Sequence, residues 1–190
     1  MNPMRIFRYV APLFLVIFTA LALSGHTSLS GDGENVPTDA GKIPSDCHFR
    51  GTGLYVLPDP KCSPGATNPD VNQGNINSTI CKSGWTGTIR PPVSVTEPEK
   101  RIEFKAYGIH APLHEYELDH IISLELGGAP NSYANYYPEL NYPDAHGYYH
   151  NPKDHLENAL RKRVCDGKMS LQEAQQAIST NWVAAYRMYG

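Results

Sequence analysis

The stretch EYELDHIISLELGGAPNSYANYYPE, residues 115–139, decides the fold of this chain. Half of the residues from 115 to 124 are apolar, which indicates a strand, and Gly127-Gly128 predicts a tight turn after it. An Asn-rich loop follows and ends at Asn135. Asp119 and His120 stand side by side on the predicted strand. Neighbours on a regular strand point to opposite faces, so both can face one cleft only at a bulge or a twist.

The residue types in this stretch suit one kind of chemistry. A hard divalent cation prefers oxygen ligands, which Asp119 supplies, and such an ion stabilises the charge of a phosphate under attack. A neutral imidazole, such as that of His120, takes a proton from water near pH 7. The pattern therefore predicts a site in which one metal ion and one general base cut a phosphodiester bond. The alternative is a structural role, because isolated Asp-His pairs are common.

Two amphipathic helices are predicted after this stretch. The first begins at Pro152, a residue type that suits the first turn of a helix, with Asn151 as its cap. The second begins at the capping box Ser170-x-x-Glu173. Residues about four positions apart form the buried stripes: Leu156, Leu160 and Val164 in the first helix, and Ala174, Ile178, Trp182 and Tyr186 in the second.

The remaining segments give coarser predictions. Thr96-x-x-Glu99 is a helix-start signature that opens a helix or turn up to about Tyr107. Gly, Pro and Asn residues recur over residues 46–95 and break up regular structure, which predicts short strands and loops there, including a strand near residues 87–90. Residues 136–150 predict an aromatic loop broken by prolines. Its tyrosines either pack against the fold, which we expect, or stack on nucleic-acid bases.

The N-terminal residues predict export. Arg5 and Arg8 precede an apolar run over residues 10–23, which is too short for a comfortable membrane span. Small residues follow the run. We therefore expect a signal peptide over residues 1–24 that is cleaved after Ser24, with an uncleaved anchor as the alternative.

The residues after the leader divide into a linker and one domain. Residues 25–45 are rich in Gly, Ser, Thr, Asp and Pro and predict a flexible linker, which leaves residues 46–190 as the folded domain. The chain has a net charge of −3, and loss of the two leader arginines makes it −5. This charge counts against a broad, non-specific nucleic-acid binder, because phosphate affinity comes mostly from Lys and Arg. Basic residues nevertheless cluster over 82–90, 100–105 and 161–163.

Four cysteines indicate disulfides in an exported protein. Cys47, Cys62, Cys81 and Cys165 contain no Cys-x-x-Cys pair, so a zinc site is disfavoured. Three pairings are possible. We prefer Cys47–Cys62, which closes a short loop, and Cys81–Cys165, which would pin an early segment to the end of the helix that begins at residue 152.

The block ELDHIISLELGG, residues 117–128, followed by Asn135 and Pro138, resembles the HNH endonuclease superfamily, whose core is the ββα-metal fold. The chain looks most like a branch of small exported bacterial HNH-like proteins. The later residues that match that branch, in order, are Lys153, Asp154, Leu156, Glu157, Val164, Cys165, Ser170, Leu171, Ala174, Gln175, Trp182 and Tyr186. The resemblance covers about residues 45–190. It implies an α+β fold with an HNH-like core, a loop-rich, disulfide-stapled N-terminal part and C-terminal helices.

The resemblance also implies roles for individual residues. His120 is expected to be the general base and Asp119 a metal ligand. Asn135 is expected to tie the loop to the hairpin and to help orient His120. An arginine, for which Arg161 is our candidate, would clamp the phosphate.

A further metal ligand should come from the helix. Many HNH nucleases carry a His shortly after the loop Asn, and this chain departs from that pattern. Asp154 is our preferred ligand, with His150 and His155 as alternatives. The expected ion is Mg²⁺, with Mn²⁺ or Zn²⁺ as alternatives.

Two functions follow from these observations. The first is an exported endonuclease, periplasmic or extracellular, that depends on a divalent metal and hydrolyses DNA or RNA. The second is a non-catalytic exported interaction module on a degenerate HNH fold, because fold does not fix function. We expect no membrane span once the leader is removed. The sequence leaves the oligomeric state open, with a monomer as one option.

Overall fold

The computed structural model describes residues 43–147 and 149–190. The predicted signal peptide, 1–24, and residues 25–42 of the predicted linker lie outside the described residues. The described helices are α1 (Trp85–Ile89), α2 (Val93–Ala106), α3 (Pro152–Cys165) and α4 (Leu171–Tyr189), and the strands are β1 (Tyr116–His120), β2 (Tyr136–Leu140), β3 (Tyr142–Pro143) and β4 (Tyr149–His150). This mixture confirms the α+β class. In this part of the chain, no helix has the length and apolar character needed to cross a membrane.

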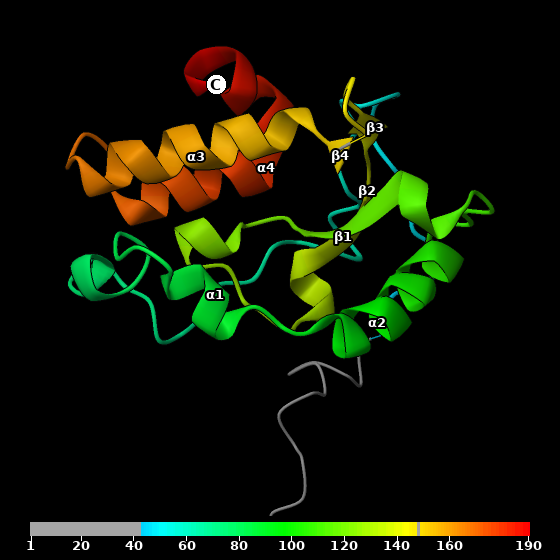
Figure 1. The fold of residues 1–190 in the computed structure, drawn as a ribbon, viewed down its shortest axis with the longest axis horizontal. Coiled ribbons are helices and arrows are strands. Elements are labelled where there is room, and N and C mark those ends of the chain that lie inside the picture. The colour runs from blue at the N-terminus through cyan, green and yellow to red at the C-terminus, as the bar shows by residue number, and fades with distance from the viewer. Residues whose placement is uncertain (1–42, 148) are drawn as a thin grey trace, which may run out of the picture. The chain divides into compact units, whose positions relative to one another are not determined.

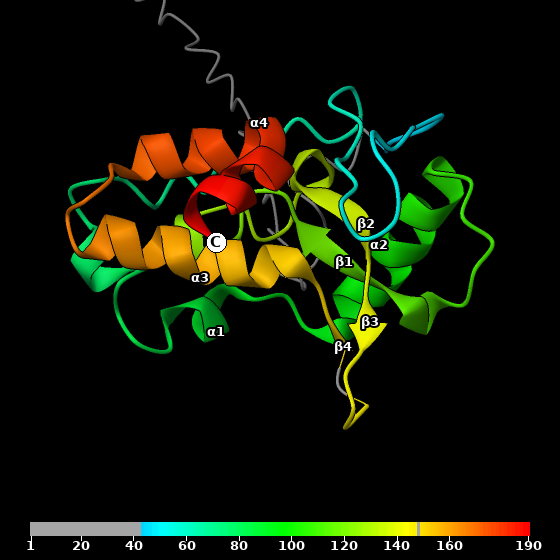
Figure 2. The same ribbon diagram turned by 90° about the horizontal axis from the view of Figure 1, so that it is seen from above.

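β1 and β2 form an antiparallel hairpin at the centre of the fold, with His120 opposite Tyr136. The hairpin lies between α2 on one side and α3 with α4 on the other (Figures 1 and 2). β1 ends at His120, so it is shorter than the strand predicted over residues 115–124. The reason is that the backbone N–H groups of Ile121 and Ile122 bond to Asn135, through its carbonyl and its side chain, and not to a ladder partner.

The connection from β1 to β2 turns back at Gly127 and Gly128. Gly127 has a φ of 71°, in the left-handed region that glycine adopts readily. A Cβ atom on Gly128 would lie 1.7 Å from the carbonyl oxygen of Ile122, so only glycine fits there. The backbone N–H of Gly128 donates to the carbonyl of Ser123 at 2.9 Å. This turn brings the Asn loop back against the end of β1.

The main core lies between α3 and α4, which run side by side (Figure 2), and extends to the β1–β2 connection. Its buried members are Val71, Ile80, Ile122, Leu126, Leu156, Leu160, Val164, Leu171, Ala174, Ile178, Trp182 and Ala185. The predicted stripes of both helices are therefore confirmed, with Tyr186 partly buried at the edge. Each fully buried leucine stabilises the fold by about 1.5–3 kcal/mol.

The structure also confirms the predicted starts of these two helices and the predicted disulfides. Asn151 caps α3 and Ser170 caps α4, and each takes part in a capping box. Both predicted disulfides are present, Cys47–Cys62 and Cys81–Cys165. The second joins the segment before α1 to the last residue of α3.

Three local predictions need correction. Residues 87–89 belong to the one-turn helix α1 and not to a strand, and Trp85, the first residue of α1, packs against the core. α2 begins at Val93, one residue after Pro92, which has the extended backbone of a helix cap, so Thr96 does not start the helix. Residues 136–140 form β2, and Tyr136 and Tyr137 are fully buried, which confirms packing for these two tyrosines.

Candidate functional site

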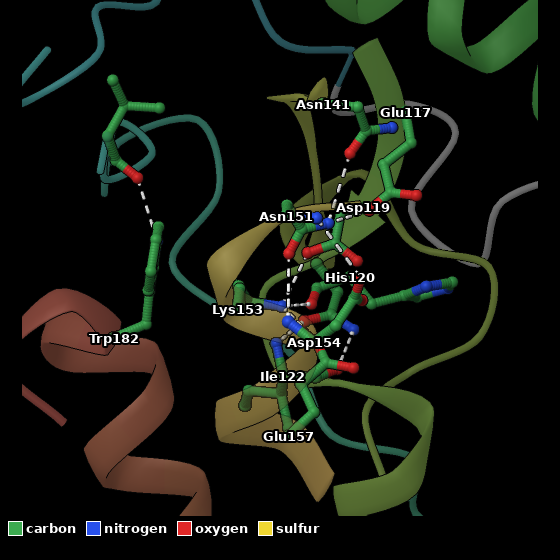
Figure 3. Close-up of polar contacts among 12 residues, drawn as sticks. Glu117, Asp119, His120, Ile122, Asn141, Asn151, Lys153, Asp154, Glu157 and Trp182 are labelled. Atoms are coloured by element: carbon green, nitrogen blue, oxygen red, sulfur yellow. Dashed lines mark hydrogen bonds and ion pairs between the residues drawn. The ribbon is translucent and has the colours of Figure 1, made fainter. Parts of the chain in front are cut away.

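Lys153, in the first turn of α3, points at Asp119 on β1 (Figure 3). Its Nζ donates to Asp119 Oδ2 at 2.6 Å, to the main-chain oxygen of His120 at 2.8 Å and to Glu157 Oε1 at 2.5 Å. A lysine ammonium carries three N–H groups, so each one has an acceptor. The side chain of Lys153 is 0% exposed and that of Asp119 is 15% exposed.

The start of α3 fixes the position of Lys153. The side chain of Asn151 accepts from the backbone N–H of Asp154 at 3.0 Å, which caps the helix. The same side chain donates through Nδ2 to Glu117 Oε1 on β1 at 2.5 Å. The first turn of α3 is therefore tied to the strand that carries Asp119, and Lys153 enters between them.

The charged groups of this buried cluster shift one another's pKa values. Burial, the largest single influence, would raise the pKa of Asp119, but Lys153 together with interactions with Glu139 and His120 holds that pKa below its usual range. Burial alone would lower the pKa of Lys153, but the charges of Asp119 and Glu157 raise it. At neutral pH both Asp119 and Lys153 are therefore charged. Burial raises the pKa of Glu157 to about 8, although Lys153 acts in the opposite direction.

Two more carboxyl groups share the hairpin face of Asp119. Oxygen atoms of Glu117, Asp119 and Glu139 lie within 4.8 Å of one another, and this is the only such group of three potential metal ligands in the described residues. Burial raises the pKa of Glu117 to about 7 and that of Glu139 well above its usual range, and the charge of Asp119 adds to both shifts. Glu139 is 1% exposed, and neither of its carboxyl oxygens makes a hydrogen bond of normal length. These raised pKa values keep Glu139 neutral at pH 7 and Glu117 only partly ionised, so Asp119 is the main negative charge on this face and Lys153 balances it.

His120 occupies the opposite face of the hairpin, and its imidazole points away from Lys153 (Figure 3). Its Nε2 lies 3.0 Å from the carbonyl oxygen of Pro130. A carbonyl oxygen only accepts, so Nε2 carries the proton and Nδ1 is the basic nitrogen. Burial lowers the pKa of His120 to about 4, and the charge of Arg90 acts in the same direction. His120 as a residue is only 5% exposed, and its imidazole is therefore neutral at pH 7.

β1 has no bulge between Asp119 and His120, because its ladder with β2 runs without interruption over these residues. The two side chains therefore diverge. Asp119 faces the first turn of α3, and His120 packs edge-on against the ring of Tyr136, with ring centroids 5.0 Å apart. The single cleft that both residues would share does not form in this arrangement.

Asn135 joins the loop to the end of β1. Its Oδ1 accepts from the backbone N–H groups of Ile122 at 2.9 Å and Ala66 at 3.4 Å. Its Nδ2 donates to the carbonyls of Ile122 and Ala129, each at 3.0 Å. The side chain is fully buried, so all of its hydrogen-bonding groups are used within the protein. Because Ile122 follows His120 by two residues, this network fixes the backbone from which the imidazole projects.

The predicted metal ligands beyond Asp119 have other partners. His150 Nε2 lies 3.1 Å from Asp144 Oδ2, in the hairpin of β3 and β4. Asp154 closes the capping box of α3, and His155 is exposed on that helix. Asp154 is near enough to Asp119 for the two charges to interact, but Asp119 Oδ2 is already bound to Lys153. In the described residues, the ligand atoms of Asp119, Asp154 and His150 do not gather within 4.8 Å of one another, and a metal ion held by this set stays a prediction.

The arginine predicted to clamp a phosphate also has a local partner. Arg161 Nε donates to the carbonyl oxygen of Ile80 at 2.7 Å. A different arginine, Arg90, is exposed and lies near His120. It borders a cavity of about 280 Å³ whose lining consists of Thr88, Ile89, Arg90, Pro91, Pro92, Pro130 and Asn131. The sequence placed Arg90 in the basic cluster over residues 82–90 but did not assign it a role beside His120.

Comparisons with known proteins do not assign this arrangement to a family. No protein-family model matches the chain, and no curated protein or solved structure matches it significantly. The function is therefore inferred from the geometry of the two faces of the β1–β2 hairpin. One face holds a saturated ion pair among carboxyl groups, and the other holds a neutral imidazole beside an arginine.

Proposed function

We propose that this protein is an exported phosphodiesterase of the HNH endonuclease type that hydrolyses DNA or RNA, with His120 as its general base. The observation that carries the proposal is the bond between His120 Nε2 and the carbonyl of Pro130. It orients the ring and makes Nδ1 the proton acceptor. The order of Asp119-His120, the Gly-Gly turn, Asn135 and α3 supports the HNH assignment. Two disulfides support export, because they persist in oxidising compartments.

The residues of the His120 face suit the hydrolytic step. Nδ1 takes a proton from water, the resulting hydroxide attacks phosphorus, and the bond to the leaving oxygen breaks. The leaving oxygen then takes a proton from solvent, and the imidazolium returns its proton to solvent. Arg90 binds the negative charge of the phosphate, as guanidinium groups do. The low pKa of free His120, about 4, makes it a weak base. A bound phosphate raises that pKa, because an anion close to the ring favours the imidazolium.

A cleavage assay with matched variants tests this proposal. Plasmid DNA and single-stranded RNA would be incubated with wild-type protein, His120→Ala and His110→Ala, with Mg²⁺, with Mn²⁺ and with EDTA. His120→Ala should lower the rate by about 10²–10⁴-fold, the usual contribution of a positioned base. His110 is exposed after the end of α2 and makes a control for the loss of an imidazole.

A second pair of variants tests the phosphate contact. Arg90→Ala should raise the KM for nucleic acid, whereas Arg161→Ala should change stability more than KM, because its Nε bonds to Ile80. Equal rates for wild type and His120→Ala would refute His120 as the base. A larger effect on KM from Arg161→Ala than from Arg90→Ala would instead support the sequence-based prediction that Arg161, on α3, binds the phosphate.

The second candidate function is a non-catalytic interaction module. The observation that favours it is the closed Asp119–Lys153 pair, which leaves the predicted metal ligand without an open position. The acidic charge of the chain without its leader agrees with this alternative. The interaction module would become the favoured function if the wild-type protein cleaved neither DNA nor RNA under any of the metal conditions above.

A further inference from the structure

The ammonium of Lys153 sits where a cation is needed. The carboxylate of Asp119 is largely buried and has the acids Glu117 and Glu139 close by. A buried negative charge in such a place destabilises the fold unless a positive charge lies beside it. Nζ supplies that charge at 2.6 Å from Asp119 Oδ2. Its second and third N–H groups bind Glu157 Oε1 and the main-chain oxygen of His120. The three acceptors are hard oxygen atoms, the ligand type that Mg²⁺ or Ca²⁺ prefers.

We propose that Lys153 is the resident cation of this site and takes the place of a divalent ion at Asp119. The inference deepens the proposed function, since it makes the phosphodiesterase independent of a metal at Asp119. It also stands without that function, because it concerns the binding of ions in the absence of substrate. A lysine held in this way gives Asp119 a fixed partner that no chelator removes.

Two features of the surroundings support this reading. First, the ammonium is saturated and fully buried, so it has no unmet hydrogen bond that would draw it out of the site. Second, a divalent ion bound to Asp119 would lie within a few ångströms of Nζ, and like charges at that distance repel strongly away from bulk water. The remaining acids, Glu117 and Glu139, would have to share Asp119 with Lys153 to hold an ion.

The test measures ion binding directly, without substrate. Mn²⁺ would be titrated into the purified protein up to millimolar concentration and followed by electron paramagnetic resonance, with thermal melting as a second readout. The variants are Lys153→Met, Asp119→Asn, Glu139→Gln and the double variant Lys153→Met/Asp119→Asn. Lys162→Met is the control, because Lys162 is on the same helix but is 74% exposed.

The wild type and Lys162→Met should show no Mn²⁺ binding that depends on Asp119. Lys153→Met should gain Mn²⁺ binding that depends on Asp119, with an affinity at least about tenfold above the detection limit set by the wild type, since a neighbouring positive charge is gone. This gain should vanish in the double variant, and Mn²⁺ should raise the melting temperature of Lys153→Met alone.

Two results would overturn the inference. One is Mn²⁺ binding to the wild type that is lost in Asp119→Asn or Glu139→Gln, since the acids would then hold an ion beside Lys153. The other is a folded Lys153→Met that gains no affinity. If Lys153→Met does not fold, the comparison of wild type with Asp119→Asn and Glu139→Gln still decides the matter. Failure of the nuclease assay alone would remove the proposed function and leave this result intact.

Discussion

Replacing Lys153 with methionine should destabilise the protein more than any other single lysine substitution on α3. Methionine keeps most of the apolar length of the side chain but removes its charge. Three hydrogen bonds are lost, and Asp119 is left as a buried carboxylate without its partner. Removing one member of a buried ion pair typically costs about 3–5 kcal/mol. For a fold of this size, that loss lowers the melting temperature by about 6–20 °C.

The loss should depend on pH. Once Lys153 is gone, burial raises the pKa of Asp119, so protonation can relieve the unpaired charge at low pH. We therefore expect the free-energy difference between wild type and Lys153→Met to be larger at pH 8 than at pH 5. Urea unfolding followed by circular dichroism at both pH values would measure it.

Lys162→Met is the matched control. Lys162 lies on the same helix and pairs with Asp166 at 2.9 Å, but it is 74% exposed. Exposed pairs contribute about 0–1 kcal/mol. If Lys153→Met were no more than about 0.5 kcal/mol less stable than Lys162→Met, which is within the usual range of a surface change, the buried ion pair would not stabilise the fold.

Three further predictions concern the fold around the site. Asn135→Ala should lower the free energy of unfolding by about 3 kcal/mol or more, because backbone groups of Ile122 and Ala129 lose buried partners; urea unfolding would show it, and a loss below about 1 kcal/mol would contradict the network. Burial raises the pKa of Glu157 to about 8 in the folded protein from an ordinary 4.5, so the folded state binds this proton more tightly than the unfolded state. The free energy of unfolding should therefore fall as the pH rises from about 5 to 9. Glu157→Gln should make this fall smaller, as melting curves across the pH range would show. Gly128→Ala should prevent normal folding because its Cβ would collide with a carbonyl oxygen, whereas Gly87→Ala, whose Cβ meets open space, should fold; near-UV circular dichroism separates these outcomes, and a native spectrum for Gly128→Ala would refute the turn geometry.

The sequence predicted those parts of the fold that depend on local signals. The four-residue spacing of Leu156, Leu160 and Val164 identified the buried face of α3, and the capping boxes located the starts of α3 and α4. The even number of cysteines and their positions indicated the two disulfides. The helix signals lie within short windows, so no knowledge of tertiary packing was needed for them. The pair Cys81–Cys165 joins residues 84 positions apart, so the sequence supported it only as a preference among three pairings.

The site depended on contacts between distant segments. The sequence places Lys153 in a helix that resembles the HNH-like pattern, but lysine is rarely buried without a partner. Only the packing of α3 against β1 supplies Asp119 as that partner. The divergence of Asp119 and His120 follows from the uninterrupted ladder between β1 and β2, which the sequence alone does not fix. Arg90 reaches the surroundings of His120 only because the segment before α2 folds back beside Pro130.

The proposed role of His120 is tested most directly by the single-turnover rate of phosphodiester cleavage. The substrate would be a fluorescently labelled DNA or RNA hairpin, incubated with excess wild-type protein or excess His120→Ala. The wild type should cleave it, and His120→Ala should be slower by about 10²–10⁴-fold with an unchanged circular dichroism spectrum. Equal rates for the two proteins, or no cleavage of either substrate by the wild type, would contradict the assignment of His120 as a general base.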